Sequence, residues 1–203
     1  MKLLFIPAIS KQKLNKSNLQ KLKKLPKNLA IAYSIQYINI AKQIQKELSK
    51  SHNITKFTQV LGCSQPRFPK STKAILLITD GKFHTTGLAI ESNLPLYTYN
   101  NIGVNQITKL EIKDFQKKQK ASYLKYLHSN NIGVFISTKP GQQNLNKALQ
   151  FKKNNKKKSY LFIANNLNTS EFENFPQIQS WVNTACRRMD INDLRIINVD
   201  RII

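Results

Sequence analysis

Short apolar runs alternate along the chain with segments in which apolar residues recur every three or four positions. Residues 29–35 and 73–79 are nearly continuous apolar runs, and each predicts a strand that is buried on both faces. Residues 36–49 carry isoleucine and leucine at four-residue spacing, which predicts a helix with one apolar side. The same patterns predict further strands at residues 2–6, 54–60, 95–99, 132–137, 159–164 and 178–184, and further helices at residues 14–24, 84–92, 112–129, 142–152 and 169–175.

This alternation of strands and helices is typical of an α/β protein. We expect two tandem small modules with mostly parallel sheets flanked by helices. The first is a middle α/β domain at residues 28–112 and the second is a carboxy-terminal α/β domain at residues 113–203. Residues 1–27 would add an amino-terminal strand and a linker helix.

The chain of 203 residues is strongly basic, with 33 lysines and arginines against 10 carboxylates and a formal charge of +23. Such a field attracts any polyanion without reading its sequence. Only five of the basic residues are arginine, whose planar fork suits specific phosphate recognition better than lysine does. The lysine run at residues 152–158 joins a predicted helix to a predicted strand and contains no aromatic residue. We therefore interpret most of the charge as solvated surface, with non-specific polyanion affinity as a by-product.

The cysteines and the lack of long apolar runs indicate the compartment. No run approaches the roughly 20 apolar residues that a membrane helix needs. The apolar stretch at the amino end is short and is interrupted by Pro7, unlike a signal peptide. Two cysteines far apart in the sequence do not form a secreted disulfide framework. We expect a soluble cytoplasmic protein that has no membrane partner.

Both cysteines follow apolar runs and are therefore candidates for a shared site. Cys63 ends the segment Val-Leu-Gly-Cys, and Cys186 follows the predicted strand at residues 178–184. In an open parallel sheet, ligands bind in the crevice beyond the carboxyl ends of the strands. Cysteines at two such ends are well placed to serve one site, although inert core cysteines would show the same positions.

Two further segments follow predicted strands. Asp80, Gly81 and His84 come after the buried strand at residues 73–79 and would face the same crevice, although an Asp-Gly pair is often only a turn. Gly141 lies where a strand leads into a helix, and it could leave backbone N–H groups free for a carboxylate or a phosphate. The spacing of a Walker motif is not present. The chain has only three histidines and few carboxylates, which argues against conventional hydrolysis.

Taken together, these segments resemble a known family in the order in which they occur. The chain is similar to the archaeal form of the diphthamide synthase family, 2-(3-amino-3-carboxypropyl)histidine synthase. The resemblance rests on Ser34-Ile-Gln36, Val60-Leu-Gly-Cys63, Asp80-Gly-Lys-Phe-His84, Gly133-Val-Phe-Ile-Ser-Thr-Lys-Pro-Gly-Gln142 and Val182-Asn-Thr-Ala-Cys186-Arg-Arg188.

The resemblance implies a fold and a chemistry. Family members have three related α/β domains, and each gives one cysteine to a four-iron, four-sulfur (4Fe-4S) cluster whose open iron binds S-adenosylmethionine. The reduced cluster releases a 3-amino-3-carboxypropyl radical, which adds to a histidine of translation elongation factor 2 in the first step of diphthamide biosynthesis. The two modules here resemble the second and third domains. Cys63 and Cys186 would be cluster ligands, and the residues implied in cofactor or substrate contact are Gln36, Asp80, Gly81, His84, Gly141 and Arg188.

The sequence departs from the family pattern in two ways. The first domain and its cysteine have no counterpart, and residues 1–8 resemble the strand that ends that domain. This implies a split gene, in which a first-domain polypeptide or a second copy of this chain completes the cluster. Arg187 stands where the family usually has proline. We also expect Cys63 and Cys186 to lie close enough to hold two corners of one cluster.

Two other functions stay open at this stage. A non-catalytic supporting subunit of the same enzyme would keep the fold and bind elongation factor 2 without performing the transfer. A basic protein associated with RNA or the ribosome is the third possibility, and its evidence is charge alone.

Overall fold

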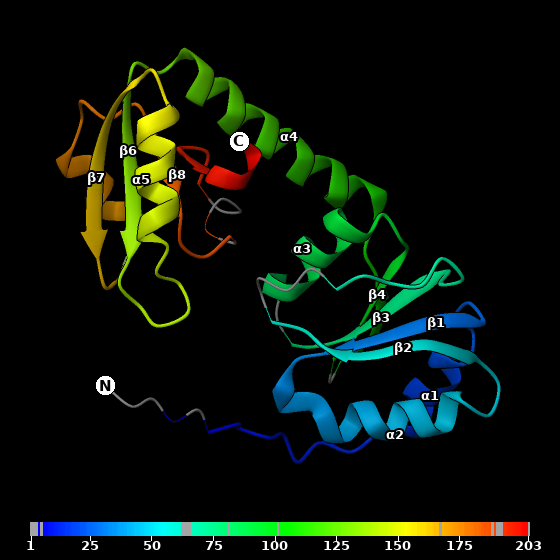
Figure 1. Cartoon of the computed structure of the whole chain (residues 1–203). Coiled ribbons are helices and arrows are strands. Elements are labelled where there is room, and N and C mark those ends of the chain that lie inside the picture. Colours follow the sequence, from blue (N-terminus) through cyan, green and yellow to red (C-terminus); the bar gives the residue numbers. More distant parts are fainter. Residues whose placement is uncertain are drawn as a thin grey trace. The chain divides into compact units, whose positions relative to one another are not determined.

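The computed structural model describes residues 4, 6–61, 66–80, 82–100, 102–166, 168–187, 189 and 193–202, with the backbone alone at residues 82–84 and 86. The chain forms two compact units, Met1–Ile112 and Lys113–Ile203, which we call the amino-terminal and carboxy-terminal units. Each unit is built around its own sheet (Figure 1).

The sheet of the amino-terminal unit has the strand order β2-β1-β3-β4-β5. The first four of these strands run parallel to their neighbours, and β5 is antiparallel to β4. The elements of this unit are α1 (Lys16–Leu22), β1 (Asn28–Tyr33), η1 (Ile35–Tyr37), α2 (Ile38–Leu48), β2 (Asn53–Gln59), β3 (Ala74–Ile78), α3 (Lys82–Ser92), β4 (Leu96–Asn100) and β5 (Gly103–Gln106).

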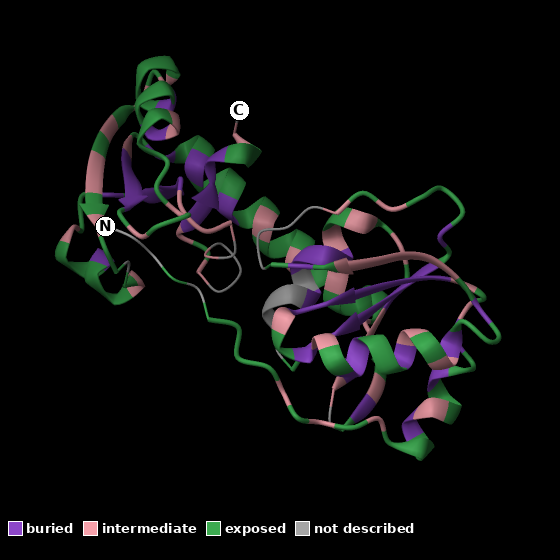
Figure 2. Ribbon diagram, turned by 60° about the horizontal axis from the view of Figure 1, so that its bottom comes forward, coloured by how far each residue is buried: buried purple, intermediate pink, exposed green. Residues whose placement is uncertain are grey.

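Two apolar clusters cover the two faces of this sheet. Successive side chains of a strand point to opposite faces, so the fully apolar strand β3 contributes to both clusters. On one face, Ile40, Ile44 and Leu48 of α2 pack against β1 and β3. On the other face, Leu88 and Ala89 of α3 pack against the same two strands. The central strands are consequently the most buried part of the unit (Figure 2).

The sheet of the carboxy-terminal unit has the order β7-β6-β8-β9, and all of its strands are parallel. Most of α4 belongs to this unit, although the helix begins in the residues assigned to the first unit. The elements are α4 (Lys109–His128), β6 (Asn131–Ser137), α5 (Leu145–Asn154), β7 (Lys158–Ala164), η2 (Thr169–Asn174), β8 (Ser180–Asn183), β9 (Ile196–Asn198) and η4 (Val199–Arg201).

An aromatic cluster packs on one face of this second sheet. Trp181 of β8 stacks on Phe172, with ring centroids 4.0 Å apart and an interplanar angle of 11°. Gly133 of β6 lies beneath the indole, where an added Cβ would come within 2.4 Å of Trp181 Cε3. Gly133 therefore belongs to the packing of the tryptophan. The opposite face is covered by Tyr126 of α4 together with Phe151 of α5.

The structure confirms the expected α/β class, with two mostly parallel sheets flanked by helices. Strands β5 and β9 were not predicted, and the helix predicted at residues 169–175 is the 3-10 helix η2. The strand predicted at residues 2–6 is not observed at its two described residues, because Leu4 and Ile6 have no regular structure and are 83% and 80% exposed. Among the described residues, no helix is both long and apolar enough to cross a membrane.

Candidate functional site

The carboxyl ends of three parallel strands meet at one edge of the amino-terminal sheet. Tyr33, the last residue of β1, is in register with Gln59 of β2 and Ile78 of β3. Segments that leave these strands therefore start at the same edge. Two of the residues predicted from the sequence, Gln36 and Asp80, follow β1 and β3 and are brought to this edge.

A buried tyrosine holds the Asp80 carboxylate. The Tyr37 hydroxyl donates a hydrogen bond to Asp80 Oδ2 across the two strand ends. Tyr37 itself is 5% exposed, whereas the side chains of Asp80 and Gln36 face solvent. The Ser34 hydroxyl is also buried, and it has no hydrogen-bond partner among the described residues. The sequence analysis missed Tyr37, although it directly follows the family-like segment Ser34-Ile-Gln36.

Several of the predicted site residues in this unit are outside the described structure. Cys63 and Gly81 lie outside the described residues. His84 is in the first turn of α3, and its side chain is not described. Val60 directly follows β2 and still pairs with β1, because its N–H donates a hydrogen bond to Tyr33 O at 2.9 Å. The proximity of Cys63 to Cys186 stays a prediction.

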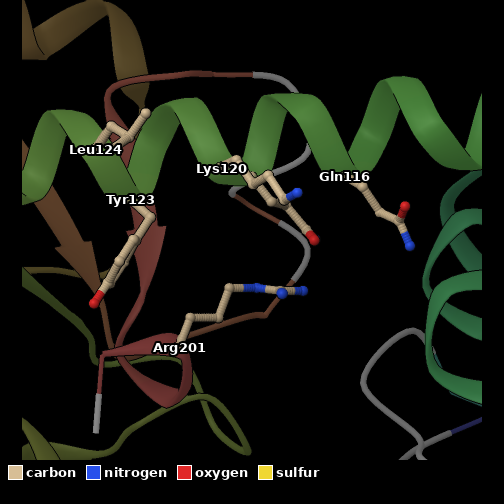
Figure 3. Close-up of a pocket in the computed structure, with 6 residues that line it drawn as sticks. Gln116, Lys120, Tyr123, Leu124 and Arg201 are labelled. Carbon is tan, nitrogen blue, oxygen red and sulfur yellow. The ribbon is translucent and has the colours of Figure 1, made fainter.

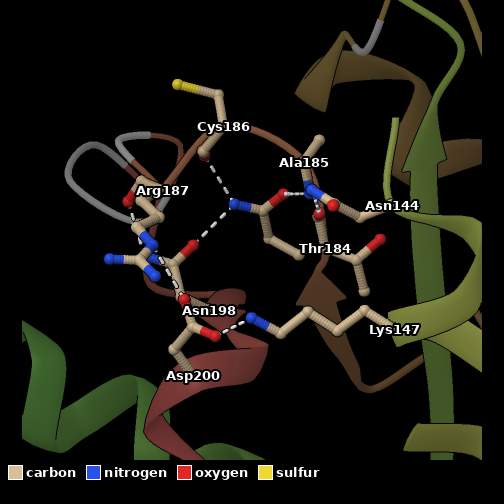
Figure 4. A network of polar contacts seen from close by, with 9 residues as sticks. Asn144, Lys147, Thr184, Ala185, Cys186, Arg187, Asn198 and Asp200 are labelled. Carbon is tan, nitrogen blue, oxygen red and sulfur yellow. Dashed lines mark hydrogen bonds and ion pairs between the residues drawn. The ribbon is translucent and has the colours of Figure 1, made fainter. Parts of the chain in front are cut away.

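Cys186 lies three residues after β8, at the carboxyl edge of the second sheet, as a half-buried free thiol. The Asn183 side chain stabilises the turn that contains Cys186. Asn183 Oδ1 accepts a hydrogen bond from Ala185 N at 2.8 Å, and Asn183 Nδ2 donates to Cys186 O at 2.6 Å. The Cys186 side chain points away from this network (Figure 4). The backbone on both sides of the thiol is thus fixed while the sulfur stays accessible.

A second asparagine connects this turn to β9. Asn198 Oδ1 accepts a hydrogen bond from Asn183 Nδ2, and Asn198 Nδ2 donates to Arg187 O. Both asparagines are buried, with 2% and 6% exposure, so these bonds are shielded from water. The backbone carbonyls of Cys186 and Arg187 are therefore both bonded to side chains.

The Arg187 side chain is held by a carboxylate. Arg187 Nε lies 2.8 Å from Asp200 Oδ2, and Lys147 from α5 pairs with the other oxygen of the same carboxylate. Burial lowers the pKa of Lys147, and the positive charge of Arg187 lowers it further. A cavity of about 170 Å³ lies beside these groups, with Asn144 and Asn183 also in its wall. The site next to Cys186 is thus polar and carries more positive than negative charge.

Gly141 lies in a turn rather than at the start of a helix. The turn is closed by a hydrogen bond from Gln142 N to Lys139 O at 3.0 Å, and α5 begins only at Leu145. Gly141 has a φ of +77°, which glycine adopts without strain, and no atom lies within 4 Å of where its Cβ would be. The expectation that Gly141 opens the helix is wrong. Arg188 lies outside the described residues.

The turn after β6 nevertheless reaches the Cys186 segment. Asn144 Nδ2 donates to Thr184 O at 3.0 Å, and Thr184 Oγ1 donates to Phe135 O of β6 at 3.0 Å. Cys186 is the one cysteine that the structure describes, and the described residues contain no group of three His, Cys, Asp or Glu side chains that could hold a metal ion. Within this part of the chain, Cys186 offers a single thiolate to a metal cluster.

The chain is an α/β protein of mostly parallel sheets, and in this class ligands bind beyond the carboxyl ends of the strands. The family model described as "Putative diphthamide synthesis protein" matches residues 1–196 of this chain. The chain therefore belongs to the diphthamide synthesis protein family. The resemblance to this family is confirmed, while the split into separate chains stays a prediction.

Curated relatives and a solved structure agree with this membership. The chain is 27% identical to the 2-(3-amino-3-carboxypropyl)histidine synthase of Pyrococcus horikoshii, over 94% of this chain and 60% of the relative. It is 24% identical to subunit 1 of the mouse synthase, over 81% of this chain and 40% of the relative. The fold matches the crystal structure of Dph2 from Pyrococcus horikoshii with a 4Fe-4S cluster, with a TM-score of 0.77 and 23% identity over 92% of this chain and 59% of that one. The chain thus spans about 60% of the length of its archaeal relative.

Proposed function

We propose that this chain is part of an enzyme that transfers a 3-amino-3-carboxypropyl group from S-adenosylmethionine to a histidine of translation elongation factor 2. The observation that carries the proposal is the free Cys186 thiol, which is fixed at the carboxyl edge of a sheet in this family fold. The archaeal relative bears the name of the synthase, and the matching crystal structure contains a 4Fe-4S cluster.

The residues next to Cys186 suit a ligand of an iron–sulfur cluster. Such clusters are held by cysteine thiolates, and hydrogen bonding around the ligands tunes their properties. The Asn183 and Asn198 amides bond to the backbone of the turn, which leaves the sulfur free to coordinate. Arg187, the next residue, is held by its ion pair with Asp200. In the proposal, Cys63 holds the second corner of the same cluster.

When bound, the reduced cluster would supply the electron that cleaves a carbon–sulfur bond of S-adenosylmethionine. The residues of this chain would bind and orient the reactants. Tyr37 fixes one oxygen of Asp80 by a hydrogen bond, so the carboxylate can present its other oxygen to a ligand. The proposed contacts with cofactor or substrate are Gln36, Asp80, Gly81, His84, Gly141 and Arg188.

The chain contains two cysteines, so a third protein thiolate for the cluster must come from outside this sequence. We propose that a first-domain polypeptide or a second copy of this chain supplies it. Exposed apolar side chains near the amino end offer a surface for such a domain, since Leu4, Ile6 and Ile9 are 83%, 80% and 46% exposed. In this view residues 1–27 form the docking region, 28–112 the middle domain and 113–203 the last domain.

The test is anaerobic reconstitution of this chain with a first-domain polypeptide of the family, followed by iron and sulfide analysis and a transfer assay on elongation factor 2. We expect Cys63→Ala and Cys186→Ala each to lower the cluster content and to abolish transfer, because each removes a soft ligand. The chain without the added polypeptide is the control. Transfer by the chain alone would show that a second copy supplies the thiolate or that none is needed.

A non-catalytic supporting subunit is the second candidate. The mouse and human relatives are named subunit 1 of the synthase, which implies an assembly in which such a subunit could have a place. The cysteine variants separate the two candidates. If both alanine variants kept full transfer activity in the assembly, this chain would be the supporting subunit and the ligand assignment would be wrong.

A further inference from the structure

An open groove of about 590 Å³ lies on the carboxy-terminal unit. One wall is the exposed side of α4, and the other is the short helix η4 near the end of the chain (Figure 3). Its volume falls within the range of about 300–1,000 Å³ that is usual for ligand sites. The lining residues are Gln116, Gln119, Lys120, Tyr123, Leu124 and Arg201.

Both walls of the groove are fixed to the core of the same unit. Residues three and four apart lie on one side of a helix, so the α4 lining residues share one face. The neighbouring face of α4 buries Ser122 and Tyr126 against the unit. On the opposite wall, Val199 is 2% exposed and Asp200 is paired with Arg187, which fixes the backbone that carries Arg201. The groove is thus formed before any ligand arrives.

The lining has the chemistry of an anion site with an aromatic surface. Of the six lining side chains among the described residues, five can donate hydrogen bonds, two of these are cationic, and none is acidic. Tyr123 is 40% exposed, so one part of its ring is open to contact. In Figure 3, Lys120 and Tyr123 extend from α4 on the side that faces Arg201. The helix carries six lysines against two carboxylates, which adds to the positive potential.

We infer that this groove binds a single-stranded nucleic acid, with phosphates at Lys120 and Arg201 and a base stacked on Tyr123. Basic grooves with an exposed aromatic ring are the usual means of binding single strands, because every base has a face that can stack. Arg201 adds a second positive charge that attracts phosphate. The amides of Gln116 and Gln119 can bond to base edges or sugars. An acidic peptide would use the two cations but would gain little from the tyrosine ring.

This inference changes how the charge of the chain is interpreted. The lysine run at residues 152–158 lacks aromatic residues, so sequence alone indicated only diffuse polyanion affinity. The fold brings Arg201 to the same groove as Lys120 and Tyr123, which is a pairing that no local sequence pattern contains. Its described lining residues are not among those proposed for the transfer reaction.

The first test measures binding of a short fluorescein-labelled oligouridylate by fluorescence anisotropy. We expect Tyr123→Leu to weaken binding about tenfold, because it removes the stacking surface. The matched control is Tyr160→Leu on β7, since Tyr160 is 36% exposed and also has a lysine, Lys158, over its ring at 5.6 Å. The control should bind like the parent. Equal losses in both variants would overturn the assignment of the groove.

The second test compares charge removal inside and outside the groove. Lys120→Gln should lower the slope of log affinity against log salt by about 0.7, as expected for one phosphate contact on a single strand. Lys152→Gln removes the same charge from an exposed position of α5 and should change affinity less. Equal effects would show a diffuse field instead of a site. Polyglutamate of matched charge should compete poorly, and equal competition would show that the groove takes acidic peptides.

Discussion

At the scale of single residues, Asn183 is the side chain on which the Cys186 turn depends. Its amide bonds to Ala185 N, Cys186 O and Asn198 Oδ1, and it is 2% exposed. Removing a buried partner leaves the opposite groups without hydrogen bonds, which costs more than the bond itself is worth. The arrangement therefore couples the geometry of the thiol to the stability of the unit.

We expect Asn183→Ala to destabilise the protein by about 1–3 kcal/mol, because three polar groups lose their partner. In a Cys63→Ala background without any cluster, the same change should raise the rate of Cys186 alkylation by iodoacetamide several-fold, as the turn loosens. Asn144→Ala is the control, since it removes one bond, to Thr184 O, from outside the turn. An alkylation rate that is the same in Asn183→Ala and Asn144→Ala would contradict the positioning role.

Some residues of the candidate site could be predicted from the sequence, and others could not. Cys186 and Asp80 could be predicted to follow strands, because an apolar run ends just before each of them. Tyr37 and Asn198 could not, because their partners Asp80 and Asn183 are distant in the sequence and become neighbours only through the order of parallel strands. Local patterns place a residue on an element, whereas hydrogen-bond partners depend on the topology.

At the scale of elements, one residue of the lysine run has a structural role. Lys157 Nζ donates to Leu127 O at 2.7 Å and to Ser129 O at 2.6 Å, and it lies 5.3 Å from the centre of the Tyr126 ring. The last carbonyls of a helix have no partner within the helix and carry partial negative charge. Lys157 therefore caps the carboxyl end of α4. The sequence had predicted that the whole lysine run at residues 152–158 is solvated.

We predict that Lys157→Met destabilises the protein by about 2 kcal/mol, since hydrogen bonds from charged donors contribute about 1.5–3 kcal/mol. The neighbouring Lys158→Met is the matched control and should change stability by less than about 0.5 kcal/mol, because its side chain is exposed. Urea denaturation of both variants measures the difference. Equal midpoints for the two variants would show that the cap contributes nothing to stability.

The start of α4 shows how a local signal can be overlooked. The apolar pattern predicts a helix from residue 112, but the helix begins at Lys109. Thr108 and Glu111 form a capping box, in which Thr108 N donates to Glu111 Oε2 at 2.8 Å and Glu111 N donates to Thr108 Oγ1 at 3.2 Å. The spacing of these two residues was visible in the sequence. Apolar periodicity alone missed it because the first turn faces solvent.

At the scale of the whole molecule, the class of the fold was the most predictable feature. Buried parallel strands such as β3 are apolar throughout, and this is visible in any window of the sequence. Strands β5 and β9 have four and three residues and owe their conformation to the strands beside them. Short edge elements of this kind cannot be predicted before the sheet is known.

Acid should weaken the carboxy-terminal unit through one ion pair. Burial raises the pKa of Asp193, but the hydrogen bonds and charge of Arg195 outweigh it, so the pKa lies below its ordinary value. The folded state therefore binds fewer protons than the unfolded state near that value. The stabilisation is complete above the unfolded pKa of about 3.9, and it is lost as the pH falls through the lower, folded pKa.

The Asp193→Asn variant tests this expectation. We predict that the parent loses more stability than the variant when the pH falls from neutral to below about 4, because the variant has no carboxylate to protonate. Arg195 also donates a hydrogen bond to Thr169 O of η2 at 3.2 Å. Loss of the Asp193–Arg195 pair should therefore also weaken the contact with η2. Urea denaturation at a series of pH values gives the comparison. Parallel curves for the two proteins across this range would contradict the role of the pair.

The stacked indole on β8 has a practical consequence for every such measurement. Trp181 is the only tryptophan of the chain, and it is 2% exposed in the aromatic cluster of the carboxy-terminal unit. Intrinsic tryptophan fluorescence therefore reports on that unit and gives no direct signal from the other. Far-ultraviolet circular dichroism detects the helices and strands of both units. Melting curves that coincide in the two signals would mean that the units unfold together, and separated curves would give each unit its own transition.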